Sequence, residues 1–139
     1  MTIECDYKLR KRYTPMNKVI HTDKAPAAVG PYSQAILAGN TLYVSGQIPL
    51  NPETGAIEAT DITGQAHQSL TNIKNILEAA GFSLNDVVKT TCLLADVNDF
   101  AAFNAVYAEY FSENKPARAC FGGNDIPKGA LVEVEVIAV

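Results

Sequence analysis

The spacing of apolar residues changes along the chain and divides it into strands and helices. Residues 17–48 contain short runs rich in β-branched residues, which predict three strands, the last two joined by a tight turn at Gly39-Asn40. Between Asp61 and Gly81 the period becomes three or four residues. This predicts a helix with one buried face formed by Ile62, Ala66, Leu70, Ile73, Leu77 and Ala80.

The second half of the chain alternates between the two patterns. Residues 86–95 are strand-like, and a second helix is expected to begin near Asn98-Asp99, with either residue as its cap. Pro116 ends that helix, and residues 117–121 and 130–139 predict two final strands. The order β-β-β-α-β-α-β-β predicts an α/β (α+β) two-layer sandwich, with one mixed sheet and two helices on one face.

Alternation within the strands predicts which residues face the helices. These are Leu42, Val44, Gly46 and Ile48 in one strand, and Val132, Val134, Val136 and Ala138 in the last. The opposite face mixes Tyr43 and Ile137 with Glu133 and Glu135, which suits neither a dry core nor a bare surface. We therefore expect neighbouring subunits of a homo-oligomer to cover it and to enclose polar groups in a ligand cleft.

The length of 139 residues fits one domain, which we assign to residues 16–139. Residues 1–15 are predicted to be a flexible N-terminal extension, and Met16 is a plausible alternative start. Removing the extension's four bases and two acids from the totals of 11 and 15 leaves seven and thirteen, a net charge of −6. An acidic body of this kind disfavours nucleic-acid binding.

Other features narrow the class of protein. The longest uncharged run, residues 25–52, is interrupted by prolines and glycines, so no membrane-spanning helix is expected. The first residues lack the apolar core of a secretion signal, which predicts a cytoplasmic location. Three scattered cysteines and two histidines, His21 and His67, predict no disulfide framework and no metal site.

Two residues stand out as candidates for chemistry. Arg118, in "PARACFGG", has no other charge between Lys115 and Asp125. It is either a surface or ion-paired arginine, with Glu133 and Glu135 as internal partners, or a bidentate clamp for a carboxylate. Glu133 is either a solvated strand residue or a group that orients a water molecule. Cys120 is most simply a small buried residue, because no histidine lies nearby to activate it.

Several separated segments resemble the Rid (YjgF-like) family of reactive imine/enamine deaminases. They are "APAAVGPYSQAILAGNTLYVSGQIPLNPETG", "GFSLNDVVKTTCLLADVNDFAAFNAVYAEYF", "KPARAC" and "IPKGALVEVEVIAV". The resemblance implies a chorismate-mutase-like fold and a homotrimer with clefts between subunits. It also implies hydrolysis of 2-imino acids, such as 2-iminobutanoate and 2-iminopropanoate, to 2-oxo acids and ammonia. No cofactor or metal is implied. The 2-imino acids named above arise from enamines released by pyridoxal-phosphate-dependent dehydratases.

The resemblance also implies roles for individual residues. Arg118 would bind the substrate carboxylate, and Glu133 would hold the attacking water. The remaining positions, which would line the cleft, are Tyr32, Ser45, Gly46, Asn104 and Cys120, the last through its backbone. The Gly122-Gly123 pair is not a phosphate-binding loop, because no phosphate-loop motif surrounds it.

One segment departs from the family pattern. Residues 121–127, "FGGNDIP", lack the charged residues expected there and are predicted to add flexibility beside Arg118, which leaves the substrate range open. Two alternatives follow. One is a non-catalytic regulator or chaperone that binds small carboxylates in the same cleft. The other is an RNA-directed activity, which the negative charge disfavours.

Overall fold

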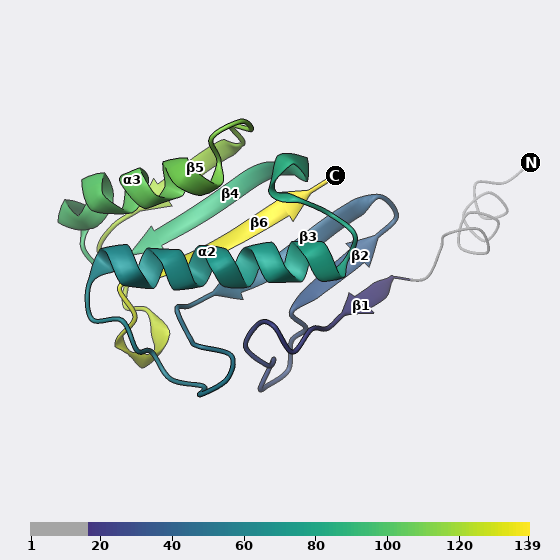
Figure 1. Cartoon of the computed structure of the whole chain (residues 1–139), viewed down its shortest axis with the longest axis horizontal. Coiled ribbons are helices and arrows are strands. Elements are labelled where there is room, and N and C mark those ends of the chain that lie inside the picture. Colours follow the sequence, from purple (N-terminus) through teal and green to yellow (C-terminus); the bar gives the residue numbers. More distant parts are fainter. Residues whose placement is uncertain (1–16) are drawn as a thin grey trace, which may run out of the picture.

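The computed structural model describes residues 17–139, which form one six-stranded sheet with two α-helices (Figure 1). The elements are β1 (Lys18–Ile20), β2 (Ala35–Ala38), β3 (Thr41–Gln47), α2 (Ile62–Ala79), β4 (Val87–Leu94), α3 (Phe100–Tyr110), β5 (Ala117–Phe121) and β6 (Val132–Ala138). The predicted order of elements is confirmed. The predicted extension, residues 1–15, lies outside the described residues.

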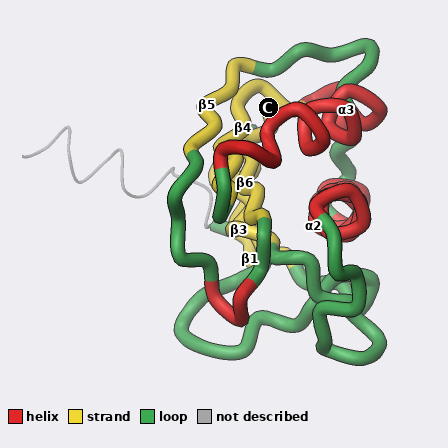
Figure 2. The backbone as a smooth tube through the Cα atoms, turned by 90° about the vertical axis from the view of Figure 1, so that its left-hand side faces the viewer, coloured by secondary structure: helices red, strands yellow, loops and turns green. Residues whose placement is uncertain are grey.

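The strands lie in the order β1-β2-β3-β6-β4-β5. Only β4 and β5 pair in parallel, and α3 makes the crossover between them, whereas the other neighbours are antiparallel. The C-terminal strand β6 is central and β5 is an edge. Viewed along the sheet, both helices lie on the same side (Figure 2). The predicted two-layer fold with a mixed sheet is therefore confirmed.

Each helix begins at a recognisable local signal. The side chain of Asp61 accepts a hydrogen bond of 2.8 Å from the amide of Gly64 and caps α2. At the other end Gly81 has a φ of 81°, as the pattern predicted for a helix stop. The predicted cap of α3 is wrong, because Asp99 makes no side-chain capping bond. Asp96 instead caps a short 3₁₀ turn, Val97–Asp99, that leads into α3.

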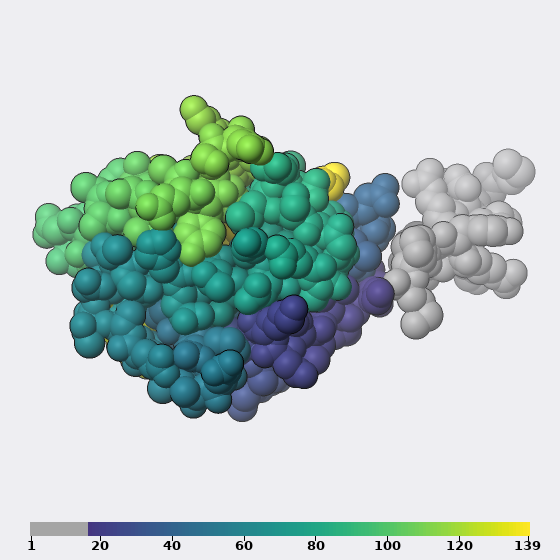
Figure 3. Space-filling view, viewed as in Figure 1, coloured from purple at the N-terminus to yellow at the C-terminus, as the bar shows by residue number. Residues whose placement is uncertain are grey.

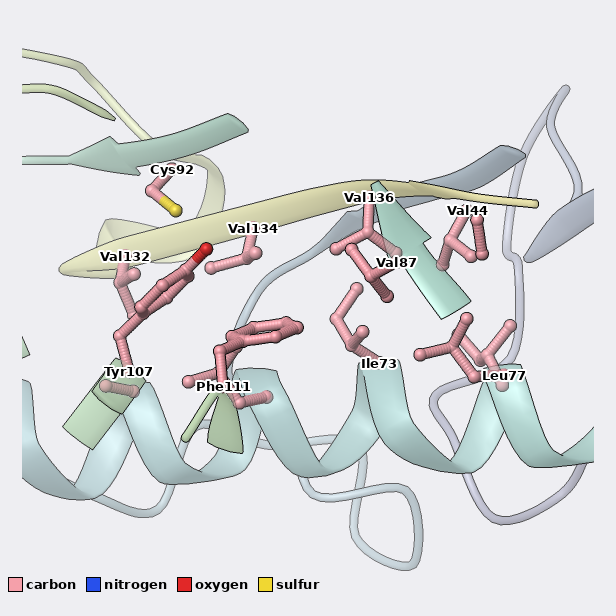
Figure 4. Packing of buried hydrophobic residues seen from close by; sticks show 14 of the residues in the cluster. Val44, Ile73, Leu77, Val87, Cys92, Tyr107, Phe111, Val132, Val134 and Val136 are labelled. Atoms are coloured by element: carbon pink, nitrogen blue, oxygen red, sulfur yellow. The ribbon is translucent and has the colours of Figure 1, made fainter. Parts of the chain in front are cut away.

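The core lies between the two helices and the central strands (Figure 4). The apolar face of α2 packs on β6, as the helical period predicted. Its fully buried members are Ala66, Leu70, Ile73, Ile76 and Leu77. Viewed from this side, α2 and α3 cover most of the sheet (Figure 3). One face of the sheet is thus closed by the chain's own helices, and the other carries none.

The alternation predicted for β3 is wrong beyond Val44. Leu42 and Val44 face the helices as expected, but the register with β6 shifts between Val44 and Gln47. Such a bulge adds a residue to one strand and reverses the faces that follow it. Gln47 is consequently the buried residue, at 5% exposure, and Gly46 faces the open side of the sheet.

The "FGGND" segment forms a hydrogen-bonded turn. The amide side chain of Asn124 donates to the carbonyls of Leu94 and Phe121, at 3.0 and 2.9 Å. Gly122 lies against Val97, and an added Cβ would come within 2.8 Å of its backbone nitrogen and Cα. These contacts hold the turn against neighbouring residues and count against the expected gain in flexibility, which stays a prediction.

Substituting Gly122 with alanine should destabilise the fold by about 1–3 kcal/mol, because the new methyl group would overlap the backbone of Val97. Urea denaturation measures this loss. The control is Asp125→Ala in the same turn, an exposed position that should change the free energy of unfolding by less than about 0.5 kcal/mol. Equal stabilities of the two variants would contradict the packing described here.

Candidate functional site

The candidate residues fall into two groups on opposite faces of the sheet. Arg118 and Cys120 of β5 are the register partners of Thr90 and Cys92 of β4, which are fully buried beneath the helices. They therefore lie on the helical side, where Asn104 of α3 joins them. Glu133 is one residue out of step with the inward-facing valines of β6 and lies on the open side.

The guanidinium of Arg118 is held by α3. Its Nη1 donates a hydrogen bond of 2.7 Å to Oδ1 of Asn104. Its Cζ lies 4.6 Å from the ring centroid of Tyr107 and 5.5 Å from that of Phe100, within the range of cation–π attraction. An arginine on an edge strand is thus given a defined position by residues one to two turns apart on a helix.

Tyr107 is itself fixed by the sheet. Its hydroxyl lies 2.8 Å from that of Thr90, and burial raises the pKa of this phenol. Neither Phe100 nor Tyr107 is among the site residues predicted from the sequence, and their contact with Arg118 was not predicted. A signal was present, because Phe100, Asn104 and Tyr107 follow the i, i+4, i+7 spacing that places residues on one helix face.

Arg118 lies beside a hollow of about 470 Å³. Its other lining residues are Asn104, Tyr107, Ala108, Phe111, Lys115 and Pro116. Within residues 17–139 no carboxylate forms a salt bridge with Arg118, so the interpretation that Glu133 or Glu135 pairs with it inside one chain is wrong. A guanidinium has five N–H donors, and the bond to Asn104 uses one. The others remain available to an acid.

The second group surrounds a hollow of about 590 Å³ on the open face. Its polar members are Tyr32, Ser45, Gly46, Gln47, Lys128, Glu133 and Glu135, and its apolar members are Pro26, Ala27, Val29, Ile48, Leu50 and Pro127. The Glu133 carboxyl packs directly on Gly46, where any Cβ would overlap it. Burial, and to a lesser degree the charge of Glu135, raises the pKa of Glu133.

Two other predicted residues line this hollow, and they differ in how available their side chains are to a ligand. The hydroxyl of Ser45 donates a hydrogen bond of 2.6 Å to the carbonyl of Ser33, so its proton is already used. Tyr32 is 54% exposed and stands at the rim. Lys128, which the sequence did not single out, also reaches this hollow from a backbone conformation with a φ of 60°.

Cys120 has the properties of a structural thiol. It is half-buried, and burial raises its pKa, although the positive charge of Arg118 offsets part of the increase. A thiol of this kind is largely protonated near neutral pH, so it reacts slowly and is not activated for nucleophilic catalysis.

No group of three or more His, Cys, Asp or Glu side chains among residues 17–139 is arranged to hold a metal ion. In the same part of the chain, no helix has both the length and the apolarity needed to cross a membrane.

The two hollows cannot serve one small molecule within a single protomer. Arg118 and Glu133 project from opposite faces of the sheet, and two strand spacings of about 4.8 Å separate their strands. A cation with unused N–H donors and a carboxyl of raised pKa are both present, but they line separate hollows.

Comparisons with known proteins bear on the function of the residues that line these two hollows. A family model described as Endoribonuclease L-PSP matches residues 22–139. A RutC family protein of Pyrococcus horikoshii is 58% identical over 123 residues, which cover 88% of this chain and 98% of the relative. A 2-iminobutanoate/2-iminopropanoate deaminase of Capra hircus is 50% identical over 124 residues, covering 89% and 90%. The crystal structure of E. coli TdcF with bound serine matches with a TM-score of 0.84 and 44% identity, covering 88% and 98%.

The surroundings of Glu133 generate a prediction about its titration. Its carboxyl should titrate above the ordinary range of a glutamate, and Glu135→Gln should lower this pKa by removing one of the two causes. Because folding favours the protonated form, the stability that this group contributes is present at low pH and is lost as pH rises through the raised pKa.

Carbon-13 NMR of the side-chain carboxyls measures both effects, with the Glu133 signal assigned by its absence in Glu133→Gln. Glu53→Gln, at an exposed turn, is the matched control and should leave the Glu133 titration unchanged. Titration of Glu133 at the usual glutamate value in the unmodified protein would show that the description of its environment is wrong.

Proposed function

Because the chain belongs to the YjgF/Rid family, whose matching model is described as Endoribonuclease L-PSP, we propose that it hydrolyses reactive 2-imino acids to 2-oxo acids and ammonia. The substrates are 2-iminobutanoate and 2-iminopropanoate, which the name of the Capra hircus relative specifies for that protein. The serine bound by E. coli TdcF carries the same carboxylate next to a nitrogen-bearing carbon.

The observation that carries this proposal is the state of Arg118. Asn104 and Tyr107 hold its guanidinium in place, it has no carboxylate partner among the described residues, and it has unused N–H donors beside a hollow. The planar guanidinium, held in this way, can donate two parallel hydrogen bonds to one carboxylate. The substrate supplies the missing anion.

We propose that a complete site forms between two subunits of a homotrimer. One subunit contributes Arg118, Asn104 and Cys120, and its neighbour contributes the open-face hollow with Tyr32, Ser45, Gly46 and Glu133. The separation of the two groups within one chain supports this arrangement. So does the open face, where large side chains are half exposed: Tyr32, Tyr43 and Phe121, at 54%, 50% and 56%.

The chemistry follows from bringing the two halves together. Arg118 fixes the 2-imino acid by its carboxylate, so that C2 is presented in one orientation. Glu133 accepts a proton from a water molecule as the water oxygen bonds to C2 of the protonated imine, which gives a carbinolamine. Return of that proton to the nitrogen makes ammonia the leaving group. As the C–N bond breaks, the hydroxyl gives its proton to the Glu133 carboxylate, which passes it to the departing ammonia, and the 2-oxo acid remains. A raised pKa suits Glu133 to these proton transfers.

The family model's description makes an RNA-directed activity the competing reading. Residues 16–139 carry a net charge of −6, which repels a phosphate backbone. Neither histidine lines the described hollows: His21 contacts Asp23, and His67 contacts Tyr110 and Glu109. Imine hydrolysis needs only an orienting cation and one carboxylate, which are present.

The cytoplasmic location expected from the sequence stays a prediction.

Substituting Arg118 with alanine should lower kcat/KM for 2-iminobutanoate by about 100-fold or more, because the substrate loses its orientation. Arg118→Lys keeps the charge but not the fork, so its kcat/KM should be intermediate. The assay generates the imine with a threonine dehydratase and follows its disappearance. Lys24→Ala, an exposed lysine outside both hollows, is the matched control and should be unaffected. Unaltered acceleration by Arg118→Ala would refute the assigned role.

Glu133→Gln separates catalysis from mere binding of a carboxylate. Turnover should be lost because the amide cannot accept the proton of water, while 2-oxobutanoate should still bind through Arg118. In the unmodified enzyme kcat should rise with pH through the raised pKa of Glu133, since only the carboxylate acts as the base. Full function in Glu133→Gln would favour the alternative of a non-catalytic carboxylate-binding regulator or chaperone.

A further inference from the structure

Two cysteines that are distant in sequence lie side by side in the sheet. Cys92 of β4 and Cys120 of β5 are register partners in the parallel pair of strands, and both are free thiols. This pairing was not predicted from the sequence, because 27 residues and the whole of α3 separate the two positions.

Both thiols face the helical layer. Register partners project from the same face of a sheet, and Cys92 is fully buried on the helical face. Figure 4 shows the Cys92 side chain directed toward the hydroxyl end of Tyr107. The two thiols are close enough for Cys120 to raise the pKa of Cys92 electrostatically.

The spacing of the strands permits a bond between these thiols. Neighbouring strands lie about 4.8 Å apart, inside the Cα separation of about 4.4–6.8 Å found for disulfides. The Cβ atoms of directly paired residues are then somewhat farther apart than the optimum of about 3.8 Å. A disulfide here would form under strain and would be readily reduced, which is typical of labile rather than structural bonds.

We propose that Cys92 and Cys120 form a reversible cross-strand disulfide when the protein meets a peroxide, and that this bond disables the half-site of Arg118. In the first step the Cys120 sulfur attacks the peroxide, takes one oxygen as sulfenic acid and releases water. In the second, the Cys92 sulfur displaces that oxygen as water. The net change is two thiols and one hydrogen peroxide giving one disulfide and two waters, and an exogenous thiol reverses it.

The two cysteines differ in burial and in pKa, and these differences suit them to the two steps. Cys120 is only half-buried, so peroxide can reach it, and the positive charge of Arg118 offsets part of the rise that burial causes in its pKa. Cys92 is fully buried, and burial raises its pKa to about 12, so it does not meet the oxidant first. Cys92 instead acts as the resolving cysteine, whose sulfur attacks the sulfenic acid formed on Cys120. The raised pKa of both thiols also keeps the pair reduced until the oxidant is concentrated.

The consequence for the site follows from the position of β5. This strand is an edge, paired only with β4, so drawing Cys120 toward Cys92 shifts β5 more easily than a central strand. Arg118 lies two residues before Cys120 and depends on its distance from Asn104 and Tyr107. A shift of β5 therefore moves the guanidinium out of register with α3.

The cross-link is tested on the full chain by treatment with hydrogen peroxide, blocking of free thiols and tryptic mass mapping without reductant. Trypsin cuts after Lys89, Arg118 and Lys128 but not before Pro116, so the two cysteines fall in separate peptides, 90–118 and 119–128. The expected product is these two peptides joined with the loss of two hydrogens, and dithiothreitol should separate them. Absence of this product at peroxide levels that oxidise Cys120 would overturn the proposal.

Matched variants assign the bond. Cys5→Ser should give the same joined peptides, and Cys92→Ser should give none, while kcat/KM before oxidation should stay within about 2-fold of the unmodified protein in both. A joined product that contains Cys5 in place of Cys92 would contradict the assignment. If Cys92→Ser folds poorly, peptide mapping of the unmodified protein still tests whether the disulfide forms.

The effect on the site rests on the proposed function and has its own readout. The cross-linked protein should lose at least about 10-fold in kcat/KM and in affinity for 2-oxobutanoate, and dithiothreitol should restore both. Full activity of the cross-linked form would overturn the switch while leaving the proposed reaction intact. If the reduced protein showed no deaminase activity, the proposed reaction would fail, and the peptide mapping would still decide whether the disulfide forms.

Discussion

The guanidinium of Arg118 lies on the ring of Tyr107 and donates a hydrogen bond to Asn104, and the account of the site depends on this contact. Each part of the fold contributes to it. The edge position of β5 leaves the charge near water, α3 supplies its ring and its amide, and the bond between Tyr107 and Thr90 ties α3 to the sheet. The guanidinium is thereby held in one position, with no carboxylate among residues 17–139 to neutralise its charge.

The geometry of a sheet then decides what one protomer can do. Side chains alternate between faces, so the even-numbered valines of β6 fill the core, and Glu133 must project to the opposite side from Arg118. The bulge in β3 turns Gly46 to the same open face, where the missing side chain makes room for the Glu133 carboxyl. The proposal that the site forms between chains rests on this separation of the two groups within one chain.

Local patterns predicted much of this fold, and tertiary contacts supplied the rest. The periods of two and 3.6 residues located the strands and helices, and Asp61 and Gly81 marked both ends of α2. The bulge at Ser45-Gly46 was not predicted, because it arises from pairing with β6 and breaks the alternation from which faces are inferred. The contacts of the "FGGND" turn were not predicted for a similar reason, since Gly122 lies against Val97 of the β4–α3 connection and Asn124 bonds to Leu94 at the end of β4. The identity of the site residues came from resemblance to a family, whereas the partners of Arg118 came from the structure.

The central claim is that Arg118 of one subunit and Glu133 of its neighbour share a site, and mixed assemblies test it most directly. Arg118→Ala and Glu133→Gln chains, each inactive alone, are co-expressed in equal amounts with different tags, and assemblies carrying both tags are purified. In a trimer that contains both kinds of chain, only one of the three boundaries joins an intact Arg118 to an intact Glu133, so about a third of the sites should contain both. The account predicts that deaminase activity returns to a corresponding fraction of the unmodified level. Mixed assemblies as inactive as their parents would contradict it.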